Sequence, residues 1–177
     1  MVDESPAESP VAEPVLEPLL KPRTADVRFI DDVQGLLEGI SALERGDGAL
    51  AVDAERASGF KYSQRAYLIQ LHRRNAPILL VDPIAILQEQ PDAFAEVQRR
   101  LAPFEWIIHA ATQDIPCLAE LGLRPQRLFD TELAGRLAGF ERVGLGAMVA
   151  RTMGLQLAKE HSAVDWSTRP LEAGWLN

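Results

Sequence analysis

GALAVDAE, residues 48–55, is an apolar run that ends in two carboxylates, and the predicted fold depends on it. The run of small and branched apolar residues predicts a buried β-strand. Successive side chains of a strand point to opposite faces of the sheet, so Asp53 and Glu55 are predicted to share one face. Such a pair is either a solvated strand end or a pair of ligands for a hard divalent cation.

Strand-like runs and helical patterns alternate along the rest of the chain. Further strands are predicted at 27–30, 67–71, 77–81, 105–108 and 127–129. Apolar residues at helical spacing predict helices over 31–44, 92–101, 113–121, 131–138 and 144–153. The pair Asp82-Pro83 is predicted to end this hairpin-like series of strands. This order predicts an α/β domain with a mixed sheet, in which an antiparallel meander precedes parallel crossovers.

A third acid follows another predicted strand. Asp114 lies beyond the strand at 105–108, in the first turn of the next helix, and is either a further metal ligand or a residue that complements the helix dipole. His109 ends the same strand, where an isolated histidine is more often a packing or hydrogen-bonding residue than a ligand. Asp130 is predicted to be the N-cap of the helix at 131–138 and is left out of the site.

Composition restricts the class of protein. The chain has 177 residues, of which 47% are hydrophobic, and this suits one globular domain with a tail. Its single cysteine, Cys117, excludes an internal disulfide and a cysteine zinc site, and favours a reducing compartment. No apolar run approaches the roughly 20 residues that span a bilayer, and no basic and apolar signal segment follows Met1. A cytoplasmic protein is therefore expected.

The net charge of −8 is unevenly spread, because half of it lies in residues 1–22, where prolines recur at every fourth position. This pattern predicts a disordered acidic, proline-rich leader over 1–23 and a folded domain over 24–177, with a docking peptide as the alternative role of the leader. Excess acid argues on its face against nucleic acid as a partner. That argument weakens once the leader is set aside and bound cations neutralise the three acids of the candidate site.

Six short segments, taken in their order and spacing, resemble one family. They are VDAE (52–55), YSQRAYLIQL (62–71), VDP (81–83), HAATQD (109–114), FDT (129–131) and DWSTRPL (165–171). Together they resemble the exonuclease domain of ribonuclease D, in its actinobacterial branch, a member of the DEDD superfamily of 3′–5′ exonucleases. The resemblance runs from about residue 24 to the last residue. It implies a ribonuclease H-like fold, with a mixed five- or six-stranded sheet flanked by helices and incomplete at the C-terminus.

The resemblance also implies a metal site and a substrate. Asp53 and Glu55 match the metal ligands of the family's first motif, and Asp114 matches the acid of its second motif. They would hold two divalent cations, Mg²⁺ or Mn²⁺, for hydrolysis of single-stranded RNA 3′ ends of the kind found on transfer-RNA precursors. Ala54 stands where the family commonly has threonine, and little consequence is expected because this side chain points away from the metals.

The family's third motif, a tyrosine and an aspartate four residues apart on a late helix, has no match in the sequence. Its expected place follows the stretch LEAGWLN, residues 171–177. The resemblance therefore predicts that these residues are an N-terminal fragment of a longer exoribonuclease, with little or no nuclease activity of its own. A C-terminal helical nucleic-acid-binding (HRDC) domain is expected in the longer chain.

Single-stranded RNA needs aromatic stacking and cationic contacts near the carboxylates. The candidate substrate contacts are Arg56, Ser58, Phe60, Tyr62 and His109. Packing in the core or under a loop explains the two aromatic residues equally well. Two alternative functions stay open, a DNA 3′–5′ exonuclease and a nucleic-acid-binding module without catalysis.

Overall fold

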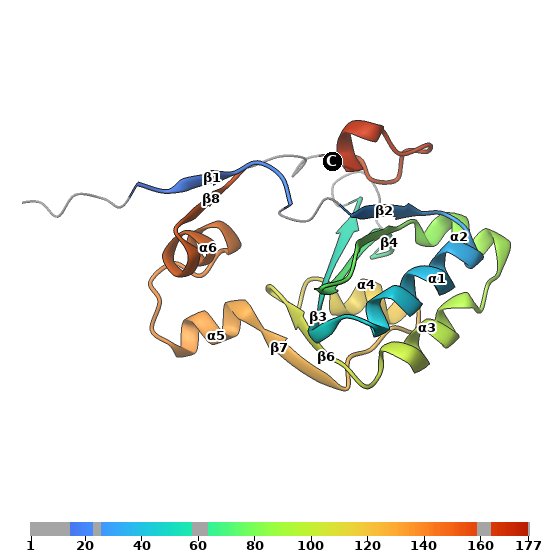
Figure 1. The fold of residues 1–177 in the computed structure, drawn as a ribbon, viewed down its shortest axis with the longest axis horizontal. Coiled ribbons are helices and arrows are strands. Elements are labelled where there is room, and N and C mark those ends of the chain that lie inside the picture. Colours follow the sequence, from blue (N-terminus) through green and yellow to red (C-terminus); the bar gives the residue numbers. More distant parts are fainter. Residues whose placement is uncertain (1–14, 23–25, 58–63, 159–163, 177) are drawn as a thin grey trace, which may run out of the picture.

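The centre of the molecule is a six-stranded mixed sheet, as predicted (Figure 1). The computed structural model describes residues 15–22, 26–57, 64–158 and 164–176. The strands are β2 (Val27–Ile30), β3 (Asp47–Arg56), β4 (Ala66–Arg74), β5 (Ile78–Val81), β6 (Glu105–Ile108) and β7 (Arg127–Asp130). Their order across the sheet is β2-β5-β4-β3-β6-β7.

The strand directions confirm the predicted meander followed by crossovers. β4 pairs antiparallel with both β3 and β5. β2 is parallel to β5, β6 is parallel to β3, and β7 is parallel to β6. Parallel neighbours need a crossover connection, which helices supply here. The register sets Asp53 opposite Gln70 and Glu55 opposite Leu68.

Four helices cover one face of this sheet: α1 (Val33–Glu44), α2 (Pro83–Glu89), α3 (Ala93–Leu101) and α4 (Ile115–Glu120). Their apolar residues form one buried cluster with the inward side chains of the strands, among them Val52 and Trp106. Asp32 is the N-cap of α1, and its carboxylate accepts a hydrogen bond from the backbone N–H of Gly35 at 2.7 Å. The apolar residues at helical spacing therefore lie in the core, as their periodicity predicts.

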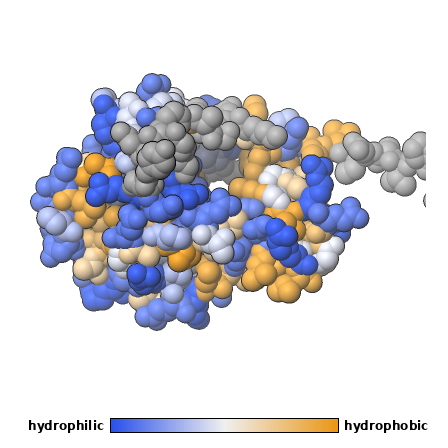
Figure 2. All heavy atoms as spheres, turned by 180° about the vertical axis from the view of Figure 1, so that it is seen from behind, coloured by the Kyte–Doolittle hydropathy of each residue, from blue (hydrophilic) through white to orange (hydrophobic). Residues whose placement is uncertain are grey.

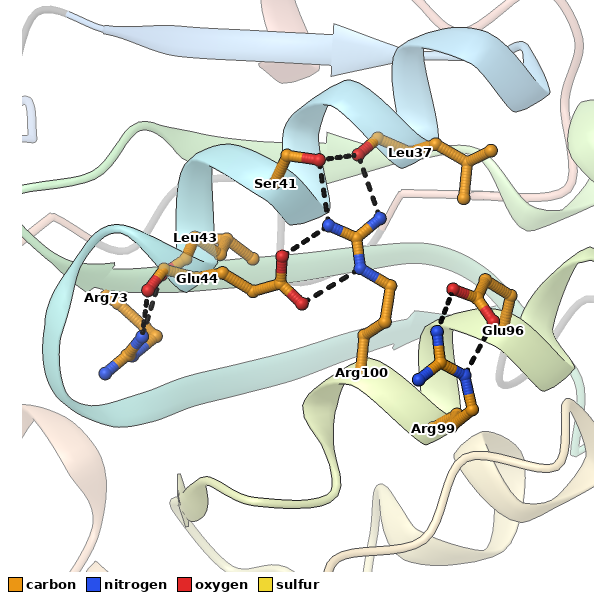
Figure 3. Close-up of polar contacts among 8 residues, drawn as sticks. All are labelled: Leu37, Ser41, Leu43, Glu44, Arg73, Glu96, Arg99 and Arg100. Atoms are coloured by element: carbon orange, nitrogen blue, oxygen red, sulfur yellow. Dashed lines mark hydrogen bonds and ion pairs between the residues drawn. The ribbon is translucent and has the colours of Figure 1, made fainter.

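An arginine from α3 ties this helix to α1 (Figure 3). The guanidinium of Arg100 donates to the carboxylate of Glu44, to the hydroxyl of Ser41 and to the backbone oxygen of Leu37. The Arg100 side chain is only 15% exposed. Arg99, the preceding residue, is 71% exposed and forms its ion pair within α3. The two neighbouring arginines thus differ in whether they join two helices.

The second face of the sheet, which carries the side chains of Asp53 and Glu55, is covered in part by residues 164–176. This segment includes the short 3₁₀ helix η1 (Ala173–Leu176). Its Trp166 packs on Leu68 and Leu80, with Trp175 at the edge of the cluster. The two tryptophan rings meet edge to face, with 5.7 Å between their centroids.

A second, smaller unit of structure follows β7. α5 (Thr131–Leu137) and α6 (Leu145–Met153) lead away from the sheet, and β8 (Leu155–Leu157) then pairs in parallel with β1 (Glu17–Leu19) (Figure 1). No residue of α6 is buried. Figure 2 shows hydrophobic surface on this side of the molecule. Its exposed apolar residues include Leu133, Leu137, Leu145 and Met153.

Two elements differ from the sequence prediction. Glu17–Leu19 forms a strand where a disordered leader is predicted, because β8 supplies a distant backbone partner; residues 1–14 lie outside the described part. Asp82-Pro83 ends the strand series at β5, as predicted, but it also begins α2, a helix that the sequence does not predict. The Asp82 carboxylate accepts hydrogen bonds from the N–H groups of Ile84 and Ala85, and the proline fits the first helical turn. None of the described helices is long and apolar enough to cross a membrane.

Candidate active site

Two carboxylates lie side by side near the end of β3. Val52 and Ala54 point into the core, so the alternation of the strand turns Asp53 and Glu55 toward the second face of the sheet. The shared face predicted from their spacing is confirmed by a third residue, Gln70, whose side chain reaches both of them.

Gln70 lies on β4, directly opposite Asp53. Its amide nitrogen, Nε2, donates to Oδ2 of Asp53 at 3.2 Å and to Oε1 of Glu55 at 3.3 Å. One amide group therefore joins two side chains that repel each other when both are ionised. The sequence alone does not indicate a role for Gln70 in the site, because that role depends on the pairing of β4 with β3.

Asp114 approaches from the loop between β6 and α4. It holds the N-cap position of α4, yet its side chain makes no capping hydrogen bond and is 6% exposed. Asp130 stabilises this loop, because its carboxylate accepts hydrogen bonds from the backbone N–H groups of Ala110 (3.1 Å) and Ala111 (2.9 Å). Ala110 has a φ of +54°, a conformation that non-glycine residues adopt only when their surroundings hold them there.

The predicted role of Asp130 as the N-cap of α5 is confirmed, because the same carboxylate accepts hydrogen bonds from the N–H groups of Glu132 and Leu133 in the first turn of this helix. Although burial alone would raise the pKa of Asp130, its hydrogen bonds with backbone N–H groups hold that pKa below the ordinary value. Asp130 thus organises the loop that carries Asp114 without being one of the candidate ligands.

The pKa values of the three candidate ligands are all raised above their ordinary values. Burial, followed by the charges of Asp53 and Asp114, raises the pKa of Glu55 to about 7. Burial and the charge of Asp53 raise the pKa of Asp114 to about 6. Asp53 is exposed over part of its surface, but protein atoms crowd its carboxylate, and this burial raises its pKa as well. The mutual repulsion shows that the three carboxylates interact electrostatically, so a bound cation would relieve it.

The chemistry of these donors fits a hard divalent cation, which prefers carboxylate oxygens. The three side chains do not form a finished cage: within the described ranges, no three His, Cys, Asp or Glu side chains are gathered closely enough to hold an ion by themselves. Mg²⁺ is commonly bound by one or two carboxylates together with waters and substrate phosphates. An open set of acids on one sheet face therefore suits an ion that is shared with a phosphorylated substrate.

The other sequence candidates have different positions. Arg56 ends β3 and lowers the pKa of both Glu55 and Asp114, so its cationic group lies near the carboxylates. Nδ1 of His109 is 2.9 Å from the hydroxyl of Thr131, which fixes the ring beside the Asp114 loop. The candidates Ser58, Phe60 and Tyr62 lie outside the described residues.

A cavity of about 410 Å³ adjoins Glu55 and Gln70. Its other walls come from the two ends of the described chain: residues 19–22, the end of β8, Trp166 and Trp175. The larger cavity, of about 780 Å³, lies elsewhere, around Arg28, Arg45 and Arg74, and does not include the carboxylates. The position of the leader and of the tryptophans beside the acids was not predicted, since it depends on long-range packing.

Arg169 fastens the segment that carries the two tryptophans. Its Nη2 donates at 2.9 Å to both Oδ1 of Asp82 and the backbone oxygen of Tyr67, and its Nε is 2.7 Å from Oδ2 of Asp82. The Asp82 side chain is 4% exposed. The DWSTRPL segment thus contributes a wall of the cavity and the ion pair that holds it in place.

Comparisons with known proteins agree with this geometry. A family model described as 3′–5′ exonuclease matches residues 27–177. Ribonuclease D of Gluconacetobacter diazotrophicus is 29% identical over 151 residues, which are 80% of this chain and 35% of that protein. The chain spans about a third of the length of the curated relatives that it matches.

Solved structures show the same fold. The crystal structure of a protein from Bifidobacterium adolescentis is 44% identical, with a TM-score of 0.85, over 92% of this chain and 39% of that chain. Escherichia coli RNase D is 25% identical, with a TM-score of 0.68, over 84% of this chain and 39% of that chain. These relatives confirm the ribonuclease H-like fold and the resemblance to ribonuclease D that the short motifs predict. The chain belongs to the 3′–5′ exonuclease family, as a domain related to the ribonucleases D.

Proposed function

We propose that this domain belongs to an exoribonuclease that removes nucleotides from RNA 3′ ends with two divalent cations, Mg²⁺ or Mn²⁺. The observation that carries the proposal is the pair Asp53 and Glu55 on one sheet face, joined by one amide and coupled to Asp114. The relatives named ribonuclease D support RNA over DNA as the substrate.

The residues of this chain have separate tasks in that reaction. Asp53, Glu55 and Asp114 supply the carboxylate oxygens that hold the cations. When bound, a pair of such cations stabilises the attacking hydroxide and the departing 3′-oxygen of an in-line displacement at phosphorus. Asp130 keeps the loop of Asp114 in place through its two backbone hydrogen bonds. Arg56 adds a positive charge next to the carboxylates, where a substrate phosphate would be attracted.

The cavity beside Glu55 is the proposed place of the terminal nucleotide. Its apolar lining includes Leu19, Leu20, Trp166 and Trp175, and its polar lining residues are Lys21, Glu55 and Gln70. Apolar walls with few polar groups are typical of sites that hold small ligands. His109 remains a proposed substrate contact, and Ser58, Phe60 and Tyr62 remain predictions from the sequence.

Three finer expectations stay predictions: transfer-RNA precursors as the substrate type, the HRDC domain, and the completion of the site by a Tyr/Asp motif beyond residue 177. E. coli RNase D is described as an exoribonuclease involved in structured RNA processing, which supports the first. Reading the coding frame past Asn177 tests the other two. If no Tyr-x-x-x-Asp sequence follows within about one helix length, the proposal of catalysis fails.

The proposal is tested with Asp53→Asn in the full-length protein, assayed with a 3′-labelled RNA and Mg²⁺ or Mn²⁺. The substitution should abolish trimming and leave the melting temperature at least as high, because the crowding that raises the pKa of Asp53 disfavours its charged form. Asp47→Asn is the matched control, since Asp47 lies at the other end of the same strand and its carboxylate accepts a hydrogen bond from Asn75. Trimming by Asp53→Asn at the unsubstituted rate would exclude this site.

The same assay separates the substrates. Matched single strands of RNA and DNA are offered in parallel, and RNA is expected to be trimmed faster. Faster hydrolysis of the DNA strand would favour the alternative function as a DNA exonuclease. Binding of both strands without hydrolysis, in a protein that contains the complete third motif, would favour a module without catalysis.

A further inference from the structure

The amide of Gln70 makes two contacts that the short sequence motifs do not assign. Nε2 donates to one oxygen of Asp53 and one oxygen of Glu55, at 3.2 and 3.3 Å. The residue is partly exposed and lies on the second face of the sheet, opposite Asp53, so it is not part of the main core. Its hydrogen bond also lowers the pKa of Glu55 and thus favours the ionised carboxylate.

From this geometry we infer that Gln70 is a positioning residue for the divalent cations, which holds the carboxylates of Asp53 and Glu55 in one fixed arrangement. The inference rests on the proposed function in that these two acids are taken as the ligands. Hydrogen bonds from a neutral donor to ionised acceptors are stronger than those between neutral groups. Without them, two like charges at positions i and i+2 of a strand would rotate apart, and a cation would have to bring them together again.

Gln70 also lies between two hollows through which solvent and ions can reach the carboxylates of Asp53 and Glu55. The residue lines the 410 Å³ cavity beside Glu55 and a second hollow of about 210 Å³ beside Asp53. An amide at this point provides N–H donors without adding charge, so it organises the acids and leaves their negative charge for the cation. A lysine or arginine would instead neutralise that charge and compete with the cation. This difference explains why a glutamine suits the position.

The test measures Mn²⁺ binding to the full-length protein by titration calorimetry, without substrate. Gln70→Leu keeps the approximate shape of the side chain and removes the donor, and Gln70→Met repeats the change with an unbranched side chain. Partners that orient metal ligands typically contribute about 10–100-fold to metal affinity, and a loss of this size is expected for both variants. Gln34→Leu is the control, because Gln34 donates to Glu38 at 2.8 Å on the exposed side of α1. It should bind Mn²⁺ as the unsubstituted protein does.

The outcomes separate this inference from the proposed function. If Asp53→Asn loses Mn²⁺ binding while both Gln70 variants keep the unsubstituted affinity, the positioning role is wrong and the site stands. If Asp53→Asn also keeps that affinity, the ion site itself, and with it the proposed function, is wrong. Melting curves without metal check the fold. Should both Gln70 variants be unfolded at the temperature of the titration, the residue serves the fold and the inference fails.

Discussion

Glu55 is expected to destabilise the folded domain at neutral pH, so Glu55→Gln should stabilise it. Burial and the charges of Asp53 and Asp114 raise the pKa of this carboxyl from 4.5 to about 7. Below pH 4.5 the group is protonated in both the folded and the unfolded chain, and the substitution changes little. As the pH rises from 4.5 toward 7, the unfolded chain loses the proton first, and the folded state becomes less stable.

The size of the effect follows from the difference between the two pKa values. It corresponds to about 3 kcal/mol above pH 7, as an upper value for a side chain that is partly exposed. For a domain of this size, 1 kcal/mol shifts the melting temperature by about 2–4 °C, so an increase of up to about 10 °C is expected. The increase should vanish below pH 4.5, where the carboxyl of the unsubstituted protein is protonated as well.

The assay is thermal unfolding followed by circular dichroism, in EDTA, at about pH 8 and at about pH 4. Glu105→Gln is the control, because Glu105 is an exposed glutamate on β6, the strand next to β3. Mg²⁺ should then stabilise the unsubstituted protein more than the Glu55→Gln variant, since the cation and the substitution relieve the same repulsion. Equal melting temperatures for Glu55→Gln and Glu105→Gln at about pH 8 would refute the claim that these acids are crowded together.

Three further predictions test how the fold and the site are supported. Arg100→Met should lower the free energy of unfolding in urea by about 1–3 kcal/mol, and Arg99→Met by less than about 0.5 kcal/mol, because only the former is shielded and joins two helices; equal losses would contradict this. Arg169→Met leaves the buried carboxylate of Asp82 without its cation and should lose about 3 kcal/mol, part of which Asp82→Asn in the same chain should recover. Asp130→Ala removes a helix cap and two loop hydrogen bonds, so it should lower stability by about 2 kcal/mol and weaken Mn²⁺ binding in titrations. Unchanged Mn²⁺ affinity would show that the loop holds its shape without this carboxylate.

Local sequence patterns were sufficient to predict most strands of the sheet and the shared face of Asp53 and Glu55. The apolar runs at 48–52 and 105–108 lie within β3 and β6. The shared face of Asp53 and Glu55 is a consequence of the two-residue period of a strand, which needs no tertiary information. Net charge was a poor guide to the family, since a chain with a net charge of −8 matches the 3′–5′ exonuclease model.

What could not be predicted depends on contacts between distant segments. Gln70 becomes important only through the register of β4 against β3, and the sequence shows it simply as a polar residue in a strand. β1 and β8 are three residues long, too short for any periodicity, and one of them contains Pro18. The helix α2 was not predicted because its 7 residues are too few for a clear periodicity, although Asp82 and Pro83 form a favourable helix start.

The pairing of β1 with β8 has a consequence for synthesis on the ribosome. Glu17–Leu19 emerges long before Leu155–Leu157 has been translated, so the backbone groups of β1 have no partner for most of that time. An unpaired strand in a nascent chain can associate with strands of other molecules. Pro18 has no N–H to donate and Glu17 carries a charge, and both features discourage such association. Pro18 and Glu17 should thus limit pairing of β1 with other chains until β8 has been made.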